Sequence, residues 1–260
     1  MKVKVVALLI SLAIIIATPA VALAQGPARP TWTSNWTDVP PDVSDGNLNT
    51  FDGEWVDAQI NYVPFLGGAF TVAIYIKNDA TNLYMAAQVP DPVENLGGDY
   101  IQVWFDNFQD GEALPGYEDI KMYYPGGAPE YQDLHLVINI PPWSADASVD
   151  GSGGYSHDGS QYTFEFSLPL NSGDPQDVAV SPGDMMVLMA HYFEDETDTS
   201  GFWPEDATED LDTWGHLQLA GPPAAPTGVQ VFPSLYIGLG AAFAAAVVAY
   251  FIRRRLLVQE

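Results

Sequence analysis

The chain has 260 residues, of which 34 are acidic and 8 are basic, and its formal net charge is −26. A surface this acidic repels phosphate groups, which argues against a protein that binds nucleic acid or anionic lipid surfaces. The chain has no cysteine, so no disulfide stabilises it, and its fold depends on the burial of apolar and aromatic side chains.

The first 24 residues have the pattern of a cleaved export signal. Lys2 and Lys4 precede an apolar run over residues 5–17, and the small residues 22–24 come directly before Gln25. A basic start, an apolar middle and a small-residue cleavage site are typical of a secretory signal peptide. We therefore expect residues 1–24 to be removed and the rest of the chain to be exported.

Residues 25–44 form a lead-in that is rich in Pro, Thr and Trp and has no clear period, so we expect it to be irregular. Residues 45–220 are expected to form one domain. Within it, short runs alternate with period two between clusters of Gly, Pro, Asn and Asp, which is typical of strands. The runs cover residues 70–77, 83–89, 100–106, 120–124, 134–140, 162–168 and 186–193. This pattern predicts an all-β fold, a single antiparallel β-sandwich.

Successive side chains of a strand point to opposite faces, so the alternation divides each run into two sets. The first set is almost wholly apolar and is the expected core: Phe70, Val72, Ile74, Ile76, Leu83, Met85, Ala87, Val89, Ile101, Val103, Phe105, Leu134, Leu136, Ile138, Ile140, Tyr162, Phe164, Phe166 and Leu168. The opposite set mixes rings with hydrogen-bonding groups. Its members are Tyr75, Lys77, Tyr84, Gln88, Tyr100, Gln102, Trp104, Lys121, Tyr123, His135, Asn139, Glu165, Met189 and His191.

The second set contains the candidate binding residues. Tyr100, Gln102 and Trp104 share one face of one strand, with Tyr84 and Gln88 on a strand expected to lie beside it. Flat rings stack on the apolar faces of sugars, while amide and carboxylate groups bind the hydroxyl groups. Lys121, His135 and Glu165 complete the candidate set. The alternative is that a second layer of structure or the lead-in covers these rings, and the sequence leaves it open.

Calcium is the candidate cofactor from the residues alone. Asp106 and Asp110 stand in an acidic loop before a glycine, although Phe108 between them breaks the ligand spacing of an EF-hand. A hydrated acidic surface explains such a loop equally well. The four histidines are scattered and no nucleophile motif is present, so we do not expect an enzyme.

The end of the chain has the pattern of a membrane anchor. A Pro-rich stalk covers residues 221–234, and residues 235–252 contain no charge, which at 1.5 Å per residue gives a helix of ~27 Å, enough to cross a bilayer core. Arg253, Arg254 and Arg255 follow directly and are retained on the cytoplasmic side. We expect a single-pass protein of the cell membrane, with its domain outside and residues 253–260 inside. Removal of this segment as a sorting signal is the alternative.

Several short motifs resemble the DOMON-like superfamily and, within it, most closely the family-9 carbohydrate-binding modules. They are Asp52-Gly-Glu-Trp55-Val-Asp-Ala58, Asn82-Leu-Tyr-Met-Ala-Ala-Gln-Val-Pro-Asp91, Asp99-Tyr-Ile-Gln-Val-Trp-Phe-Asp106, Tyr162-Thr-Phe-Glu-Phe-Ser-Leu-Pro169 and Pro182-Gly-Asp184. The resemblance implies a jelly-roll-like β-sandwich, often stabilised by calcium and presented on extracellular proteins.

The same superfamily includes haem b domains, such as those of cellobiose dehydrogenase and ethylbenzene dehydrogenase, which use a methionine with a histidine or a lysine as axial ligands. The resemblance therefore implies an alternative cofactor, haem b. Met189, His191 and Lys121 are the candidate ligands, with Met85, Met122 and His135 as further options. Met189 and His191 share one face of one strand, so those two cannot bind an iron from opposite sides.

Three functional hypotheses follow. The first is a membrane-anchored, non-catalytic module that binds carbohydrate or another polymer at the cell surface. The second is an extracellular b-type cytochrome domain that transfers electrons. The third is a structural surface protein. The sequence does not identify the ligand, the partner proteins or the oligomeric state.

Overall fold

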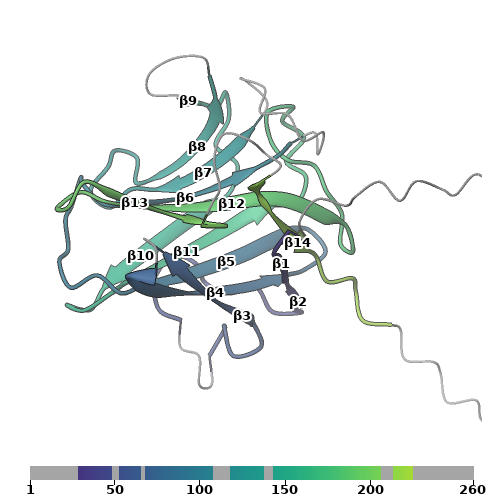
Figure 1. Cartoon of the computed structure of the whole chain (residues 1–260). Coiled ribbons are helices and arrows are strands. Elements are labelled where there is room, and N and C mark those ends of the chain that lie inside the picture. Colours follow the sequence, from purple (N-terminus) through teal and green to yellow (C-terminus); the bar gives the residue numbers. More distant parts are fainter. Residues whose placement is uncertain are drawn as a thin grey trace, which may run out of the picture. The chain divides into compact units, whose positions relative to one another are not determined.

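The computed structural model describes residues 29–48, 53–65, 68–107, 118–137, 143–205 and 213–224. Its described residues form strands arranged in two stacked sheets, and none of them is α-helical (Figure 1). The predicted all-β sandwich is therefore confirmed. The described residues contain no helix with the length and apolar character that a bilayer crossing requires. The expected export signal and the expected span at 235–252 lie outside them.

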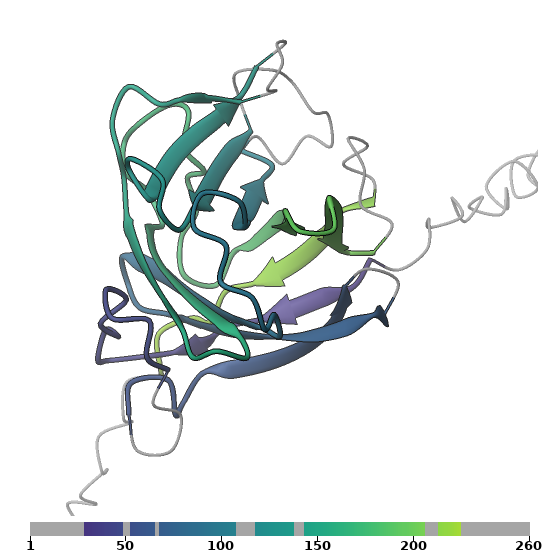
Figure 2. The same ribbon diagram turned by 90° about the vertical axis from the view of Figure 1, so that its left-hand side faces the viewer.

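The first sheet contains eight described strands in the order β1-β14-β12-β6-β7-β8-β9, and β13 also pairs with β12. The bounds are β1 Thr31–Thr33, β6 Tyr100–Phe105, β7 Asp119–Tyr123, β8 Tyr131–Leu136, β9 Trp143–Ala145, β12 Met185–Glu194, β13 Thr199–Trp203 and β14 Gly215–Gln218. β6 to β9 form an antiparallel meander, which Figure 2 shows from the side. We call this the eight-stranded sheet.

The second sheet contains six described strands in the order β10-β11-β5-β4-β2, and β3 also pairs with β4. The bounds are β2 Asn35–Trp36, β3 Gln59–Phe65, β4 Phe70–Asn78, β5 Asn82–Val89, β10 Ser152–His157 and β11 Tyr162–Pro169. We call this the six-stranded sheet. β5 pairs with β4 and β11, whereas β6 belongs to the other sheet, so the expectation that β5 lies beside β6 is wrong. The connection between them, residues 90–99, contains two prolines and two glycines, and it crosses between the sheets instead of forming a hairpin.

The main core fills the space between the two sheets. The predicted apolar sets of β4, β5, β6 and β11 all take part in it, including Ile76, Val89, Phe105 and Phe164, each of which is fully buried. These strands pack against the opposite sheet along their whole length, so their hydrophobic alternation predicts the inward face correctly.

The sequence suggests an irregular lead-in, but part of the lead-in forms strands. β1 pairs with β14 in parallel, and β2 pairs with β4 in parallel, so residues 31–36 contribute to both sheets. The two sheets are consequently mixed and not purely antiparallel. Trp32 anchors this segment because its ring stacks on Trp203, with the ring centroids 3.4 Å apart. The sequence signal failed here because strands of two or three residues are too short to show a period.

Residues 37–48 and 53–58 lie over the outer face of the six-stranded sheet, and we call them the covering segment. Trp55, Val43 and Leu48 pack there against Tyr75 and Tyr84. Lys77 fastens the segment because its Nζ donates to the Glu54 carbonyl oxygen and to Asp57 Oδ1, each at 2.5 Å. This outer face is therefore a second, smaller core and not an open surface.

The faces of β7 and β8 are the reverse of those predicted. Tyr123 belongs to the main core, and Lys121, two residues earlier on the same strand, shares its inward face. Ile120, Met122 and Leu134 form a separate apolar cluster on the outer side of the sheet. The prediction assigned Lys121, Tyr123 and His135 to the outside and Leu134 to the core, and these assignments are wrong.

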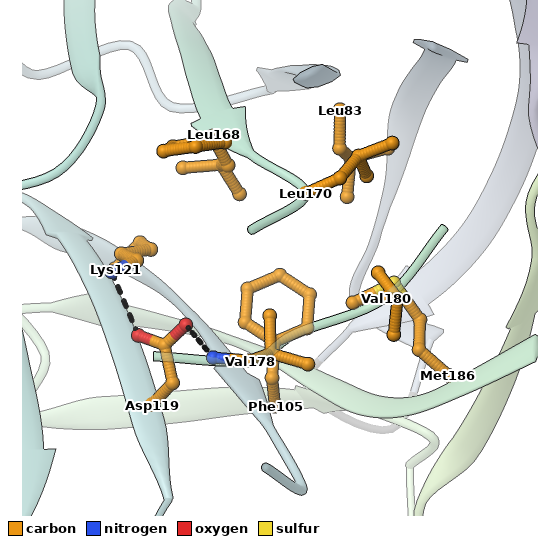
Figure 3. Close-up of a pocket in the computed structure, with 10 residues that line it drawn as sticks. Leu83, Phe105, Asp119, Lys121, Leu168, Leu170, Val178, Val180 and Met186 are labelled. Atoms are coloured by element: carbon orange, nitrogen blue, oxygen red, sulfur yellow. Dashed lines mark hydrogen bonds and ion pairs between the residues drawn. The ribbon is translucent and has the colours of Figure 1, made fainter. Parts of the chain in front are cut away.

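An ion network inside the sandwich explains why β7 and β8 turn polar side chains toward the other sheet. The Lys121 ammonium contacts Asp133, Asp177 Oδ1 at 2.6 Å and Asp119 Oδ1 at 3.0 Å, and all four residues are at least nine-tenths buried. Lys121 and Asp119 line a pocket between the sheets together with Phe105, Leu168 and other apolar side chains (Figure 3). His135 pairs with Asp146, and its register partner on β7 is Asp119. Because Asp133 and Asp177 come from other segments of the chain, alternation on β7 alone could not reveal that Lys121 points inward.

Candidate functional site

The outer face of the eight-stranded sheet carries a group of partly exposed rings, which we call the ring face. Tyr100 and Trp104 come from β6, Phe193 from β12 and Phe202 from β13, and Tyr124 and Trp143 flank them. All six are intermediate in exposure. Aromatic pairs hold them in place, because Tyr100 stacks on its cross-strand partner Phe193 with centroids 5.1 Å apart. The described part of the molecule therefore presents aromatic surface on this side.

Trp104 lies between two other indole rings. Its ring meets Trp143 and Trp214 edge to face, at centroid distances of 6.4 and 6.3 Å. Trp214 is buried and packs with Met189 beside it. Edge-to-face contacts on both sides fix the plane of the Trp104 ring, so its orientation is set before any ligand arrives.

Gln102 lies beneath these rings and organises the polar part of the site. Its side chain is fully buried. The Gln102 Oε1 atom accepts from Trp104 Nε1 and from His191 Nδ1, both at 3.0 Å. Its Nε2 donates to Met122 Sδ at 3.3 Å. Because an indole N–H can only donate, Trp104 fixes which end of the amide carries the oxygen.

This arrangement also fixes the state of His191. A carbonyl oxygen can only accept, so the Nδ1 atom that faces Gln102 carries the proton, and Nε2 is left with a free lone pair. Burial lowers the pKa of His191 to about 4, so the ring is neutral at physiological pH. His191 Nε2 is buried and has no hydrogen-bond partner. The ring itself is held between Phe202, stacked at 4.5 Å, and the edge of Tyr100. His191 is therefore a neutral, oriented ring that lies beneath the exposed rings of the site.

Three of the predicted binding residues, Tyr100, Gln102 and Trp104, come together in this way. Gln102 does not reach the surface, however, because Trp104 and His191 cover it. It positions its neighbours instead of offering an open amide.

The other predicted binding residues lie elsewhere. Tyr84, Gln88 and Glu165 are on the outer face of the six-stranded sheet, where the covering segment buries Tyr84 and Glu165. Tyr84 donates to Asp79 Oδ2 at 2.8 Å, and Gln88 Oε1 accepts from Tyr75 at 2.9 Å. Lys121 and His135 lie on the inward face of the eight-stranded sheet. None of these five residues contacts the ring face.

The candidate haem ligands do not form an axial pair. Lys121 lies on the inward side of β7, whereas Met189 and His191 lie on the outward side of β12. Met122 is on the ring-face side, but it packs on the Gln102 amide group, and Met85 is in the main core. These residues offer no two ligands facing each other across a space for an iron, so they do not fit haem b.

The predicted calcium loop is described only in part. Asp106 is buried directly after β6, and its backbone N–H donates to the Val187 carbonyl oxygen at 3.1 Å. Asp110 lies outside the described residues, so this pair stays a prediction.

Sequence reasoning missed part of the ring face. Phe193 follows Met189 and His191 at the same spacing, so its place could have been predicted from alternation. Trp143 and Phe202 lie on short strands, of three and five residues, among polar and acidic residues. Their position depends on pairing with β8 and β12, for which the local sequence gives no signal.

No protein-family model and no curated protein matches the chain. Solved structures with a similar fold exist. A family 9 carbohydrate-binding module from Caldicellulosiruptor kristjanssonii in complex with cellotriose has a TM-score of 0.51 at 15% identity, over 76% of this chain and 97% of the module. Its complex with glucose has a TM-score of 0.50 at 13% identity, over 76% and 99%. A candidate carbohydrate-binding protein from Bacteroides uniformis has a TM-score of 0.50 at 11% identity, over 74% and 99%. At these identities the likeness concerns the fold, which is a β-sandwich like that of these proteins.

Proposed function

We propose that the chain is a non-catalytic carbohydrate-binding module that acts outside the cell. The observation that carries this proposal is the ring face, where six partly exposed aromatic rings lie together on one side of the eight-stranded sheet and ring contacts fix their orientation. Rings such as Trp104 and Tyr100 stack on the apolar C–H face of a sugar. The similar folds solved with cellotriose and glucose support the same class of ligand.

The charge of the protein narrows the class of sugar. With a formal net charge of −26, the molecule repels uronic acids and sulfated sugars, and this repulsion weakens as salt is added. None of the six rings or His191 supplies a positive charge that would bind an acidic group. Neutral glucans are therefore the proposed ligands.

The test is a calorimetric titration of the full-length chain, in mild detergent, with cellotriose and with glucose. We expect saturable binding of one cellotriose per chain. A Tyr100→Leu variant removes one of the partly exposed rings offered to the sugar, so its affinity should fall about 5- to 10-fold, the contribution of one stacked ring. As a matched control, Tyr62→Ser removes a ring that is 71% exposed on β3 of the six-stranded sheet and should leave the affinity unchanged.

The proposal is wrong if millimolar cellotriose produces no saturable heat with the unaltered chain. It is also wrong if Tyr62→Ser weakens binding as much as Tyr100→Leu, because the ring face would then not be the site. In the first case, the structural surface protein becomes the better interpretation.

We also propose that residues 235–252 anchor the module, on the strength of the uncharged segment and the three arginines that follow it. Alkaline washing of membranes should leave the full-length chain in the pellet and release a chain that ends at residue 224. Release of both chains would contradict the anchor.

A further inference from the structure

Three carboxylates meet at the edge of the covering segment. Asp45 and Glu54 belong to that segment, and Glu165 comes from β11 beneath it. One oxygen from each residue lies within 4.8 Å of the other two. The group therefore joins the covering segment to the outer face of the six-stranded sheet, away from the ring face.

Glu165 is the member that makes this group unusual. Its side chain is fully buried. Glu165 Oε1 accepts from Trp55 Nε1 at 2.6 Å, whereas Oε2 has no hydrogen-bond partner. A buried carboxylate oxygen without a partner is costly, so native structures normally satisfy it with a donor, a water or an ion.

No cation of the described residues balances these charges. Lys77 is the nearest candidate, but its Nζ is engaged by the Glu54 carbonyl oxygen and by Asp57 Oδ1. No ion pair formed among the described residues includes the carboxylate of Asp45, Glu54 or Glu165. Burial raises the pKa of Glu165 to about 7. The Trp55 hydrogen bond and the Gly46 backbone N–H oppose this rise, and Asp45 and Glu54 add to it. The group therefore gathers negative charge that nothing described in the chain neutralises.

Two other carboxylate groups differ from this one. The group of Asp119, Asp133, Asp146 and Asp177 already surrounds the ammonium of Lys121. In the group of Asp91, Glu194 and Glu196, the buried member has both oxygens engaged, by the Tyr192 hydroxyl at 2.7 Å and by the Val93 backbone N–H at 2.9 Å. Only the Glu165 group, among these three, combines a buried oxygen without a partner and the lack of an internal cation.

We propose that Asp45, Glu54 and Glu165 bind a divalent cation of the calcium type, which fastens the covering segment to the six-stranded sheet. The ligands are all oxygens, and neither histidine nor cysteine takes part, which favours a hard cation over a transition metal. Two ligands from a loop and one from a strand give the adaptable geometry that calcium accepts, with water or carbonyl groups completing the shell. This site is separate from the predicted pair Asp106 and Asp110.

The experiment compares thermal unfolding of the full-length chain in mild detergent, in EGTA and in millimolar calcium. Calcium at a hundredfold excess over its dissociation constant should raise the Tm of the unaltered chain by about 5 to 10 °C. Glu165→Gln should abolish this shift. Its amide oxygen still accepts from Trp55 and one buried charge disappears, so its Tm in EGTA should equal or exceed that of the unaltered chain.

Glu196→Gln makes the same chemical change in another carboxylate group, at an exposed residue, and should keep the full shift. If Glu165→Gln does not fold, Asp45→Asn replaces it as the test variant. Asp45 lies at the exposed rim of the group, and this variant should strongly reduce the calcium-induced rise in Tm. A shift that is absent from the unaltered chain overturns the proposal. A shift that persists in Glu165→Gln, or in Asp45→Asn where that variant decides, also overturns it, because the cation then binds elsewhere.

This outcome is independent of the sugar-binding proposal. The cation site lies under the covering segment of one sheet and the ring face lies on the other sheet. Glu165→Gln should therefore bind cellotriose as tightly as the unaltered chain.

Discussion

Replacing Lys121 by methionine is expected to lower the free energy of unfolding by about 3–5 kcal/mol, the usual cost of removing one partner from a buried ion pair. Methionine preserves the shape of the side chain but removes the charge. Lys121 is 2% exposed, and Asp119, Asp133 and Asp177 would remain beside the apolar pocket of Figure 3 without their cation. Urea unfolding at neutral pH measures the effect.

Lys77→Met is the matched control. Lys77 is equally buried, but the side chain of its acidic partner Asp57 is 49% exposed, so water can solvate the carboxylate that is left, and the loss should be smaller. Adding Asp133→Asn to Lys121→Met should recover part of the stability, since it removes one uncompensated charge. If Lys121→Met lowers the free energy of unfolding no more than Lys77→Met does, the ion network does not stabilise the fold as proposed.

The effect of Lys121→Met should also depend on pH. Burial raises the pKa of Asp119 to about 8 and that of Asp133 to about 6, although Lys121 opposes both shifts. Between about pH 4 and 8 the folded chain therefore holds more protons at these groups than the unfolded chain, so their contribution to stability falls as the pH rises. Without Lys121 the two carboxyls bind protons still more readily. The stability difference between the variant and the unaltered chain should consequently shrink from pH 8 to pH 5.

Replacing Trp104 by alanine should weaken cellotriose binding about 30-fold or more, the effect of truncating an aromatic anchor of a binding surface. Trp104 offers a ring to the sugar and holds the Gln102 amide that orients His191. Its removal takes away the stacking surface and also the indole donor that holds the Gln102 amide. Calorimetric titration measures the change in affinity.

Two further measurements make the Trp104 result specific. Trp104→Phe keeps a ring but not the donor to Gln102, so its affinity should be intermediate. Circular dichroism should show an unchanged β-sheet spectrum for both variants, because Trp104 lies outside the main core. An unaltered affinity in the alanine variant would contradict a role for this ring in binding.

The sequence predicted the sandwich and the core faces of its long strands because these strands pack uniformly against the opposite sheet. β4 and β11 show this most clearly, since Ile74, Ile76, Phe164 and Phe166 all point inward as their alternation indicates. The same reasoning failed for β7 and β8, where polar groups point inward and apolar groups outward. There, Lys121 meets carboxylates up to 56 residues away in sequence, and a local pattern does not contain that information.

The candidate site was predictable to a similar extent. Tyr100 and Trp104 were recognised because they alternate on one strand, and His191 was assigned to the same outward set of its own strand. Their meeting depends on the pairing of β6 with β12, and the burial of Tyr84 and Glu165 depends on the covering segment. Both are long-range features that the motifs of a single strand do not encode.

The indole N–H signals of the chain report whether the ring face binds a neutral sugar. With tryptophan labelled with ¹⁵N and the Trp104 and Trp55 signals assigned from Phe variants, cellotriose is added to the full-length chain. We expect a saturable shift of the Trp104 signal and no shift of Trp55, which is buried under the covering segment of the other sheet. A Trp104 signal that does not move at saturating cellotriose, or a shift seen only at Trp55, would contradict sugar binding at the ring face.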